Sequence, residues 1–198
     1  GVERHTLADV ATLVQRNEPT RMDVGRVDGR CFINSCGFGF DASVLEATKR
    51  VRFLKGDAVY IYSALRQLFS YRGVSISVES SEATPTAMLM LTISNGQFLG
   101  GAFRIAPHAS AVDGKLDVGL FNDPGLLGRV RIFASAFRGS HVGLPSVETR
   151  RAAQITLRFA SPPLVEVDGE LRQALSSTVT VECIPGALGV IAAPGYPR

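Results

Sequence analysis

The stretch Ala87-Met88-Leu89-Met90-Leu91-Thr92-Ile93 is the longest apolar run in the chain, interrupted only by Thr92. A short apolar run bounded by turn residues is typical of a strand that is buried on both faces. Upstream of it, Val74, Ile76 and Val78 alternate with serines, which indicates a second strand. A turn rich in Ser, Glu, Thr and Pro separates the two segments, so we expect them to pair.

Outside this pair, short alternating segments are separated by Gly, Pro and Ser. We expect strands at 22–27, 31–36, 116–121, 153–159, 164–167, 178–184 and 188–192. Apolar residues at helical spacing predict one helix capped by Asp41, a second beginning at Asp57 and a third at 126–137. Many strands and few helices predict an α+β fold, mainly β, with antiparallel sheets packed as a sandwich.

Composition limits the kind of protein that this sequence can encode. With 198 residues, 45% of them hydrophobic, the chain has the size and apolar content of one globular domain. The net charge is only +3 and the basic residues are scattered, which argues against a nucleic-acid-binding protein. The longest apolar run is far too short to span a membrane. Three cysteines without a CxxC motif fit a reduced, cytoplasmic protein.

Four segments are denser in Gly, Asn and Asp than packing requires: 38–41, 94–101, 106–117 and 167–170. Each also has a purely structural interpretation. Asn95-Gly96 is typical of a hairpin turn, Gly100-Gly101 of a flexible bend, and Asp168-Gly169 of a strand reversal. Taken one at a time, these segments do not distinguish a turn from a site.

Their order is more informative. The sequence contains Gly37-Phe38-Gly39-Phe40-Asp41, then Ser94-Asn95-Gly96 with Gly100-Gly101, then Asp113-Gly114-Lys115-Leu116-Asp117, then Asp168-Gly169-Glu170 and Pro185-Gly186-Ala187-Leu188. This series resembles the C-terminal half of the diacylglycerol kinase-like lipid kinases, the superfamily that includes sphingosine and ceramide kinases. The resemblance extends from about residue 23 to about residue 194. It implies a β-sandwich domain with helices and an active site in a cleft between two domains.

The resemblance also indicates what this chain lacks. Members of the family begin with an ATP-binding domain whose Gly-Gly-Asp-Gly-Thr loop holds the phosphates, and no such loop occurs here. Since the chain also begins at Gly1, we expect a C-terminal domain cut from a longer enzyme, with residues 1–21 as the tail of the inter-domain region. Its expected partners are that N-terminal domain and a lipid at the membrane surface, where a cytoplasmic enzyme would bind peripherally. A homodimer is left open.

The resemblance assigns the general base to Glu170. A carboxylate suits this role because phosphoryl transfer to a lipid hydroxyl needs an acceptor for the hydroxyl proton. Asp168 lies two residues earlier, so in an extended segment both carboxylates would face the same side. Asp168 would then orient Glu170, raise its pKa or contact a metal through water. The alternative is an Asp-Gly turn with exposed acids.

The expected cofactors are Mg²⁺ and ATP, with ATP held mainly by the absent domain. Mg²⁺ prefers oxygen ligands, and the resemblance implies a structural cation site at Asp113 with the carbonyls of Ser110 and Lys115; a plain turn is the alternative. Asn95, Gly96, Gly100 and Gly101 would let the backbone approach the nucleotide or the lipid. His141 matches a family position, but a lone histidine is more often structural.

Two other functions compete with an ATP-dependent lipid kinase. One is a non-catalytic lipid-binding or interaction domain, and the other is an NAD kinase-like enzyme, whose acceptor is a ribose hydroxyl. Asp168-Gly169-Glu170 followed by Pro185-Gly186-Ala187-Leu188 favours the lipid kinase. The basic segment 49–55, interleaved with apolar residues, is either a contact for anionic lipid headgroups or a solvated helix end.

Overall fold

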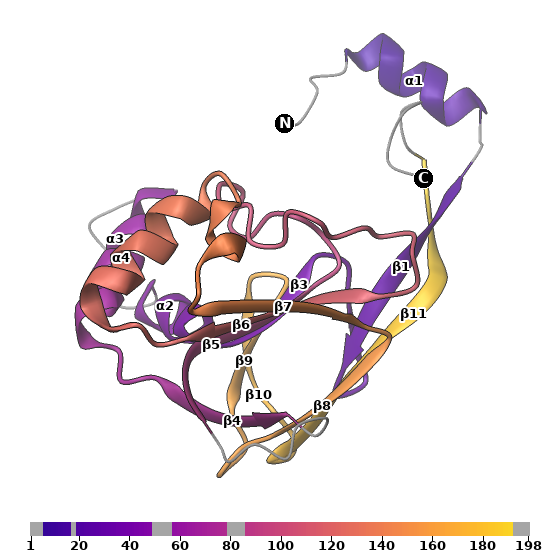
Figure 1. Ribbon diagram of the computed structural model, residues 1–198. Helices are drawn as coiled ribbons and strands as arrows, with labels where there is room; N and C mark the ends of the chain where they lie inside the picture. The colour runs from indigo at the N-terminus through magenta and orange to yellow at the C-terminus, as the bar shows by residue number, and fades with distance from the viewer. Residues whose placement is uncertain (1–5, 17–18, 49–56, 79–85, 192–198) are drawn as a thin grey trace.

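The fold was analysed in a computed structural model, which describes residues 6–16, 19–48, 57–78 and 86–191 (Figure 1). Eleven strands form one sheet, and every pairing in it is antiparallel. The strands are β1 (Thr20–Val27), β2 (Arg30–Phe32), β3 (Ser35–Gly39), β4 (Val74–Val78), β5 (Thr86–Ser94), β6 (Leu116–Asn122), β7 (Val147–Ala152), β8 (Gln154–Arg158), β9 (Leu164–Val167), β10 (Glu170–Gln173) and β11 (Thr178–Val190).

The sheet runs in the order β10-β9-β3-β5-β4-β8-β11-β1-β2, with β6 and β7 branching from β5. It curls so that its two halves face each other around one apolar core. Phe38, Leu91 and Val165 come from the β9-β3-β5 half, and Leu157 and Val181 from the β8-β11 half. This arrangement confirms the predicted α+β, mainly β, sandwich-like fold.

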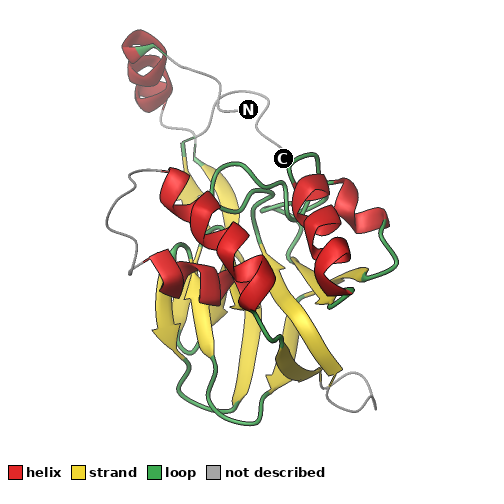
Figure 2. Ribbon diagram, turned by 90° about the vertical axis from the view of Figure 1, so that its left-hand side faces the viewer, coloured by secondary structure: helices red, strands yellow, loops and turns green. Residues whose placement is uncertain are grey.

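Three helices cover the outer face of the β9-β3-β5-β6 half (Figure 2). They are α2 (Phe40–Thr48), α3 (Asp57–Ser70) and α4 (Gly125–Ala136), and a 3₁₀ helix, η1 (Ser140–Gly143), follows α4. A second apolar core lies between these helices and the sheet, and includes Val44, Leu68, Phe121 and Ile132. The sheet half is therefore buried on both faces, as the unbroken apolar run of β5 predicted.

A fourth helix, α1 (Leu7–Arg16), lies apart from this body, beyond the ends of β1 and β11 (Figures 1 and 2). Leu7 and Val14 on it are exposed. None of the helices in the described part of the chain is long and apolar enough to cross a membrane.

The structure corrects several predicted element boundaries. The strand predicted at 31–36 is two strands, β2 and β3, separated at Ile33 and Asn34. The strands predicted at 178–184 and 188–192 are instead one strand, β11, which continues through Pro185-Gly186. It stays continuous because the Gly186 N–H bonds to the Asp23 carboxylate (2.8 Å), opposite an irregularity in β1. The sequence prediction missed β7 and β10.

Candidate functional site

The turn between β9 and β10 consists of Asp168 and Gly169. Both adopt left-handed backbone conformations, with φ of 47° and 87°, and Val167 pairs with Glu170 across the turn. This geometry matches the Asp-Gly strand reversal read from the sequence. Since the residues form a turn and not an extended segment, the reasoning that placed Asp168 and Glu170 on one face does not apply.

The Asp168 carboxylate is an anchor for a second turn. Its oxygens accept hydrogen bonds from the backbone N–H groups of Ile33 (2.8 Å), Asn34 (3.0 Å) and Ser35 (2.9 Å). In return, the Asp168 N–H donates to the Ser35 carbonyl (3.0 Å). These bonds separate β2 from β3 and fix the β9–β10 turn against the 33–35 segment.

Glu170 is the first residue of β10, directly after this turn. Its side chain is exposed and forms an ion pair with Arg172, two residues along the same strand. The structure therefore places the predicted base at the surface, at the end of a well-anchored hairpin. It does not bring Glu170 into contact with the Asp168 carboxylate, which accepts its hydrogen bonds from backbone N–H groups.

A pair of buried carboxyl groups, which the sequence prediction did not identify as a site, lies beside the same turn. Asp41 in the first turn of α2 is 3% exposed, and Glu166 on β9 is 5% exposed. Glu166 pairs in register with Gly37 of β3, so its side chain leaves the sheet on the face where a Gly37 side chain would stand. Asp41 occupies that space, because a Cβ on Gly37 would lie 1.4 Å from Asp41 Oδ2.

Burial controls the protonation of this pair. It raises the pKa of Asp41 to about 7, although a backbone hydrogen bond from Ala42 partly opposes the shift. Burial, together with the charge of Asp41, raises the pKa of Glu166 to about 8. Asp41 Oδ2 and Glu166 Oε2 have no hydrogen-bond partner among the described residues. Burial disfavours the charged form of a carboxyl group, so it favours the neutral form of both side chains.

Two pockets meet at Asp41. The first, of about 290 Å³, has polar groups in its lining and includes Asn34, Glu166, Asp168 and Gly169. The second is narrow, about 50 Å³, and is enclosed mainly by apolar side chains of β5, α3 and α4. Asp41 and Leu99 line both pockets. The arrangement places polar groups near the β9–β10 turn next to a small apolar space under the helices.

In the segment 95–101, which was predicted to approach the nucleotide or the lipid, Asn95 and Gly96 form hydrogen bonds within the fold. The Asn95 side-chain amide is buried and donates to the carbonyls of Asp23 and Ile33, at 2.9 Å each. The backbone N–H groups of Asn95 and Gly96 both donate to the Asn34 carbonyl. Gly100 lines the polar pocket, and Gly101 follows it in a turn with positive φ.

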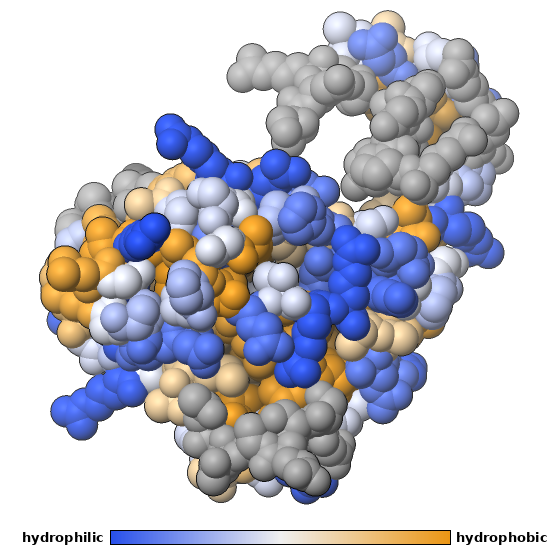
Figure 3. Space-filling view, viewed as in Figure 1, coloured by the Kyte–Doolittle hydropathy of each residue, from blue (hydrophilic) through white to orange (hydrophobic). Residues whose placement is uncertain are grey.

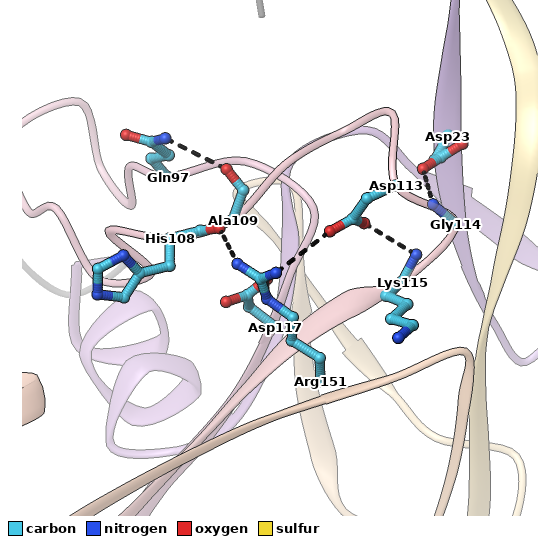
Figure 4. A network of polar contacts seen from close by, with 9 residues as sticks. All are labelled: Asp23, Gln97, His108, Ala109, Asp113, Gly114, Lys115, Asp117 and Arg151. Atoms are coloured by element: carbon cyan, nitrogen blue, oxygen red, sulfur yellow. Dashed lines mark hydrogen bonds and ion pairs between the residues drawn. The ribbon is translucent and has the colours of Figure 1, made fainter. Parts of the chain in front are cut away.

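The segment 110–117 forms the tight turn that the sequence predicted (Figure 4). Gly114 has φ of 71°, and its N–H donates to the buried Asp23 carboxylate (2.7 Å). Asp113 accepts a hydrogen bond from the Lys115 N–H (3.1 Å) and lies 3.6 Å from the Arg151 guanidinium. The same guanidinium lies 3.4 Å from Asp117.

These contacts allow a test of whether the turn fits Mg²⁺. One oxygen of Asp113 has only the 3.6 Å contact with Arg151, and a carboxylate oxygen is a ligand of the kind that Mg²⁺ prefers. Burial raises the pKa of Asp117 despite the nearby Arg151. Among the described residues, no group of three or more His, Cys, Asp or Glu side chains could hold a metal ion, and the Arg151 guanidinium supplies positive charge at Asp113; a cation bound at Asp113 stays a prediction.

His141 lies in η1 and is completely buried. Its Nε2 is 3.0 Å from the Ile105 carbonyl, and its ring stacks on Phe121 with centroids 5.6 Å apart. Burial lowers its pKa. These contacts support the structural interpretation of this histidine. The basic segment 49–55, which the sequence analysis considered for lipid contact, lies outside the described residues.

Comparisons with known proteins identify a domain family and relatives that are named as lipid kinases. Residues 34–192, more than half of the chain, match the model of the YegS C-terminal NAD kinase beta sandwich-like domain. Diacylglycerol kinase of Bacillus subtilis is 24% identical over 174 residues, which cover 86% of this chain and 57% of that protein. Diacylglycerol kinase of Mycobacterium tuberculosis is 26% identical over 178 residues, which cover 86% of this chain and 56% of that protein.

Solved structures show the same fold. A diacylglycerol kinase from Bacillus anthracis superposes with a TM-score of 0.63 at 16% identity, over 96% of this chain and 60% of that one. This chain thus spans somewhat more than half the length of the relatives that it matches.

Proposed function

The chain belongs to the YegS C-terminal NAD kinase beta sandwich-like domain family, and we propose that it is the C-terminal domain of a kinase that transfers the γ-phosphate of ATP to a lipid hydroxyl. The names of its relatives support an enzyme that phosphorylates a lipid alcohol such as diacylglycerol. Because the chain covers 57% and 56% of these relatives, we assign ATP binding mainly to an N-terminal domain that precedes it.

The junction of the two pockets at Asp41 is the observation that carries this proposal. A lipid alcohol has a polar head and an apolar tail, and the site offers a pocket with polar groups that shares Asp41 and Leu99 with an apolar pocket. Gly169 of the β9–β10 turn lines the polar pocket, and Glu170 follows it directly. A hydroxyl held in the polar pocket would thus be close to the hairpin that carries the proposed base.

The proposed roles of the residues follow from their chemistry. Glu170 accepts the hydroxyl proton, as a general base does in phosphoryl transfer. Asp168 holds the turn through its three backbone hydrogen bonds, and so acts on Glu170 by position. Mg²⁺, when bound at Asp113 with the carbonyls of Ser110 and Lys115, would brace the 110–117 turn. Gly100 remains the candidate for backbone contact with a substrate because it lines the polar pocket.

The helical end of the molecule fits contact with a membrane surface, where the lipid substrate resides. Figure 3 shows hydrophobic residues gathered over α3 and α4. Phe69 on α3 is 70% exposed, and Leu127 on α4 is 88% exposed. We include peripheral binding through this end in the proposal, since a large exposed apolar patch often marks a site of interaction with a protein or a membrane.

An activity panel tests the proposed function. The full-length kinase that contains this chain is incubated with ATP, Mg²⁺ and one acceptor at a time: diacylglycerol, monoacylglycerol, sphingosine, ceramide or NAD. We expect phosphorylation of a lipid alcohol and none of NAD. The 198-residue chain alone serves as the control and should not turn over ATP. Phosphorylation of NAD would favour an NAD kinase-like enzyme, and lipid binding without turnover would favour a non-catalytic domain.

A further inference from the structure

The buried Glu166 carboxyl group has a contact that the proposed reaction does not use directly. Its Oε1 accepts a hydrogen bond from the Gly169 backbone N–H, which belongs to the β9–β10 turn. The turn is therefore held from two directions. The Asp168 side chain holds it from the 33–35 segment, and the Glu166 side chain holds it from β9. Glu170 follows at once, so its place depends on both anchors.

The second oxygen of Glu166 faces an acidic environment. The groups that act on its ionisation are Asp41 from α2 and Asp168 from the turn, and both disfavour a negative charge on Glu166. On β3, the buried Cys36 thiol has its pKa raised by burial and by these same acids, so it supplies no positive charge. On β10, the Arg172 guanidinium is paired with Glu170. No basic group acts on Glu166 among the described residues.

We propose that Glu166 is a positioning residue, whose Oε1 holds the Gly169 N–H and thereby fixes the turn that presents Glu170. The role of Glu170 as base rests on the proposed function, but the coupling of Glu166 to the turn does not. Protonation places a donor on Oε2, which has no hydrogen-bond partner among the described residues, while Oε1 remains an acceptor for Gly169. Ionisation adds a negative charge at a buried position where the charges of Asp41 and Asp168 disfavour it.

The expected dependence on pH has a definite sign. A carboxyl group whose pKa is raised by folding stabilises the native state at low pH, and this contribution is lost as pH rises to the folded-state pKa. For Glu166 that loss runs from its ordinary value of 4.5 to about 8. Asp41 adds a parallel loss between 3.8 and about 7. The stability of the fold around Glu166 should therefore fall on the alkaline side, although the Gly169 hydrogen bond opposes this loss because it lowers the pKa of Glu166.

The variant Glu166→Gln keeps the shape of the protonated Glu166 side chain but cannot ionise. Glutamine keeps an acceptor for Gly169 and a permanent donor, as the protonated acid does. We would titrate the Gly169 and Glu170 backbone amides of the 198-residue chain by NMR from pH 6 to 9.5. In wild type the Gly169 signal should shift with a midpoint near pH 8, and in Glu166→Gln this transition should be absent. Glu148→Gln, an exposed site on β7, is the matched control and should titrate like wild type.

Thermal unfolding gives an independent readout. Between pH 6 and pH 9, the melting temperature of wild type should fall by about 5 °C or more relative to Glu166→Gln, because a domain of this size shifts about 2–4 °C per kcal/mol.

In the full-length kinase, Glu166→Gln should extend the alkaline limb of the kcat profile, whereas Glu166→Ala should lower kcat at least tenfold with little change in the KM for ATP. A Gly169 amide that does not titrate in wild type, or the same titration in Glu166→Gln, would overturn the proposal, even if the lipid kinase activity is established.

Discussion

Replacing Asp168 measures how strongly one side chain holds the candidate site together. Its carboxylate accepts three backbone hydrogen bonds of 2.8–3.0 Å. A hydrogen bond to a charged group contributes about 1.5–3 kcal/mol, but Ile33 is exposed and its freed N–H would rebind water. Taking a discounted value of about 1 kcal/mol for each bond, and about 1 kcal/mol for alanine in the left-handed conformation, Asp168→Ala should lower the free energy of unfolding by about 3–4 kcal/mol.

Two further variants at Asp168 separate the loss of the hydrogen bonds from the cost of the left-handed backbone conformation. Asp168→Asn keeps one oxygen for Asn34 and Ser35 and tolerates φ of 47°, so it should lose only about 1–2 kcal/mol. Asp168→Gly removes all three acceptors but relieves the backbone, and should fall between the other two. Urea denaturation of the 198-residue chain, followed by far-UV circular dichroism, measures all three. A loss below about 0.5 kcal/mol for Asp168→Ala, typical of an ordinary surface site, would show that the carboxylate does not anchor the turn.

The remaining predictions concern the carboxyl pair and the cation site. Gly37→Ala should destabilise the chain by about 2 kcal/mol or more, because its Cβ would overlap Asp41 Oδ2; Gly143→Ala, where nothing lies within 4 Å, is the control and should unfold like wild type. Equal losses for the two variants, measured by urea denaturation, would contradict the placement of Asp41. Millimolar Mg²⁺ should raise the melting temperature of wild type but not of Asp113→Ala, since a ligand specific for the folded state stabilises it. An identical Mg²⁺ response in both proteins would contradict a cation site at Asp113.

Local sequence patterns predicted much of the fold. The apolar run at 87–93 lies within β5, and the alternation at 74–78 coincides with β4. The break at Ile33-Asn34 was missed because it depends on the Asp168 carboxylate, which is distant in sequence. The continuity of β11 was missed for a similar reason, since Asp23 supplies the acceptor for the Gly186 N–H. Both errors arise from side chain-to-backbone bonds that no local pattern reveals.

The candidate site was predictable to a smaller extent. The Asp168-Gly169 turn and the Asp113-Gly114 turn follow from residue type alone. The meeting of Asp41 and Glu166 depends on the register that pairs Gly37 with Glu166. One sequence signal was available, because Glu166 lies between Val165 and Val167 in a strand that is buried on both faces. A charged residue in such a position indicates a special environment.

The rate of phosphoryl transfer in Glu170→Gln tests the central claim most directly. The rate is measured in the full-length kinase at saturating ATP and lipid. Glutamine keeps the size of the Glu170 side chain but cannot accept the hydroxyl proton. Loss of a general base typically lowers the rate by about 10²–10⁴-fold, while the KM values for ATP and lipid should change little. Glu148→Gln is the surface control and should retain the wild-type rate. Rapid-quench measurement of a single turnover should show this loss at the chemical step; a Glu170→Gln rate above about one third of wild type, where a base contributes about a hundredfold or more, would contradict the account.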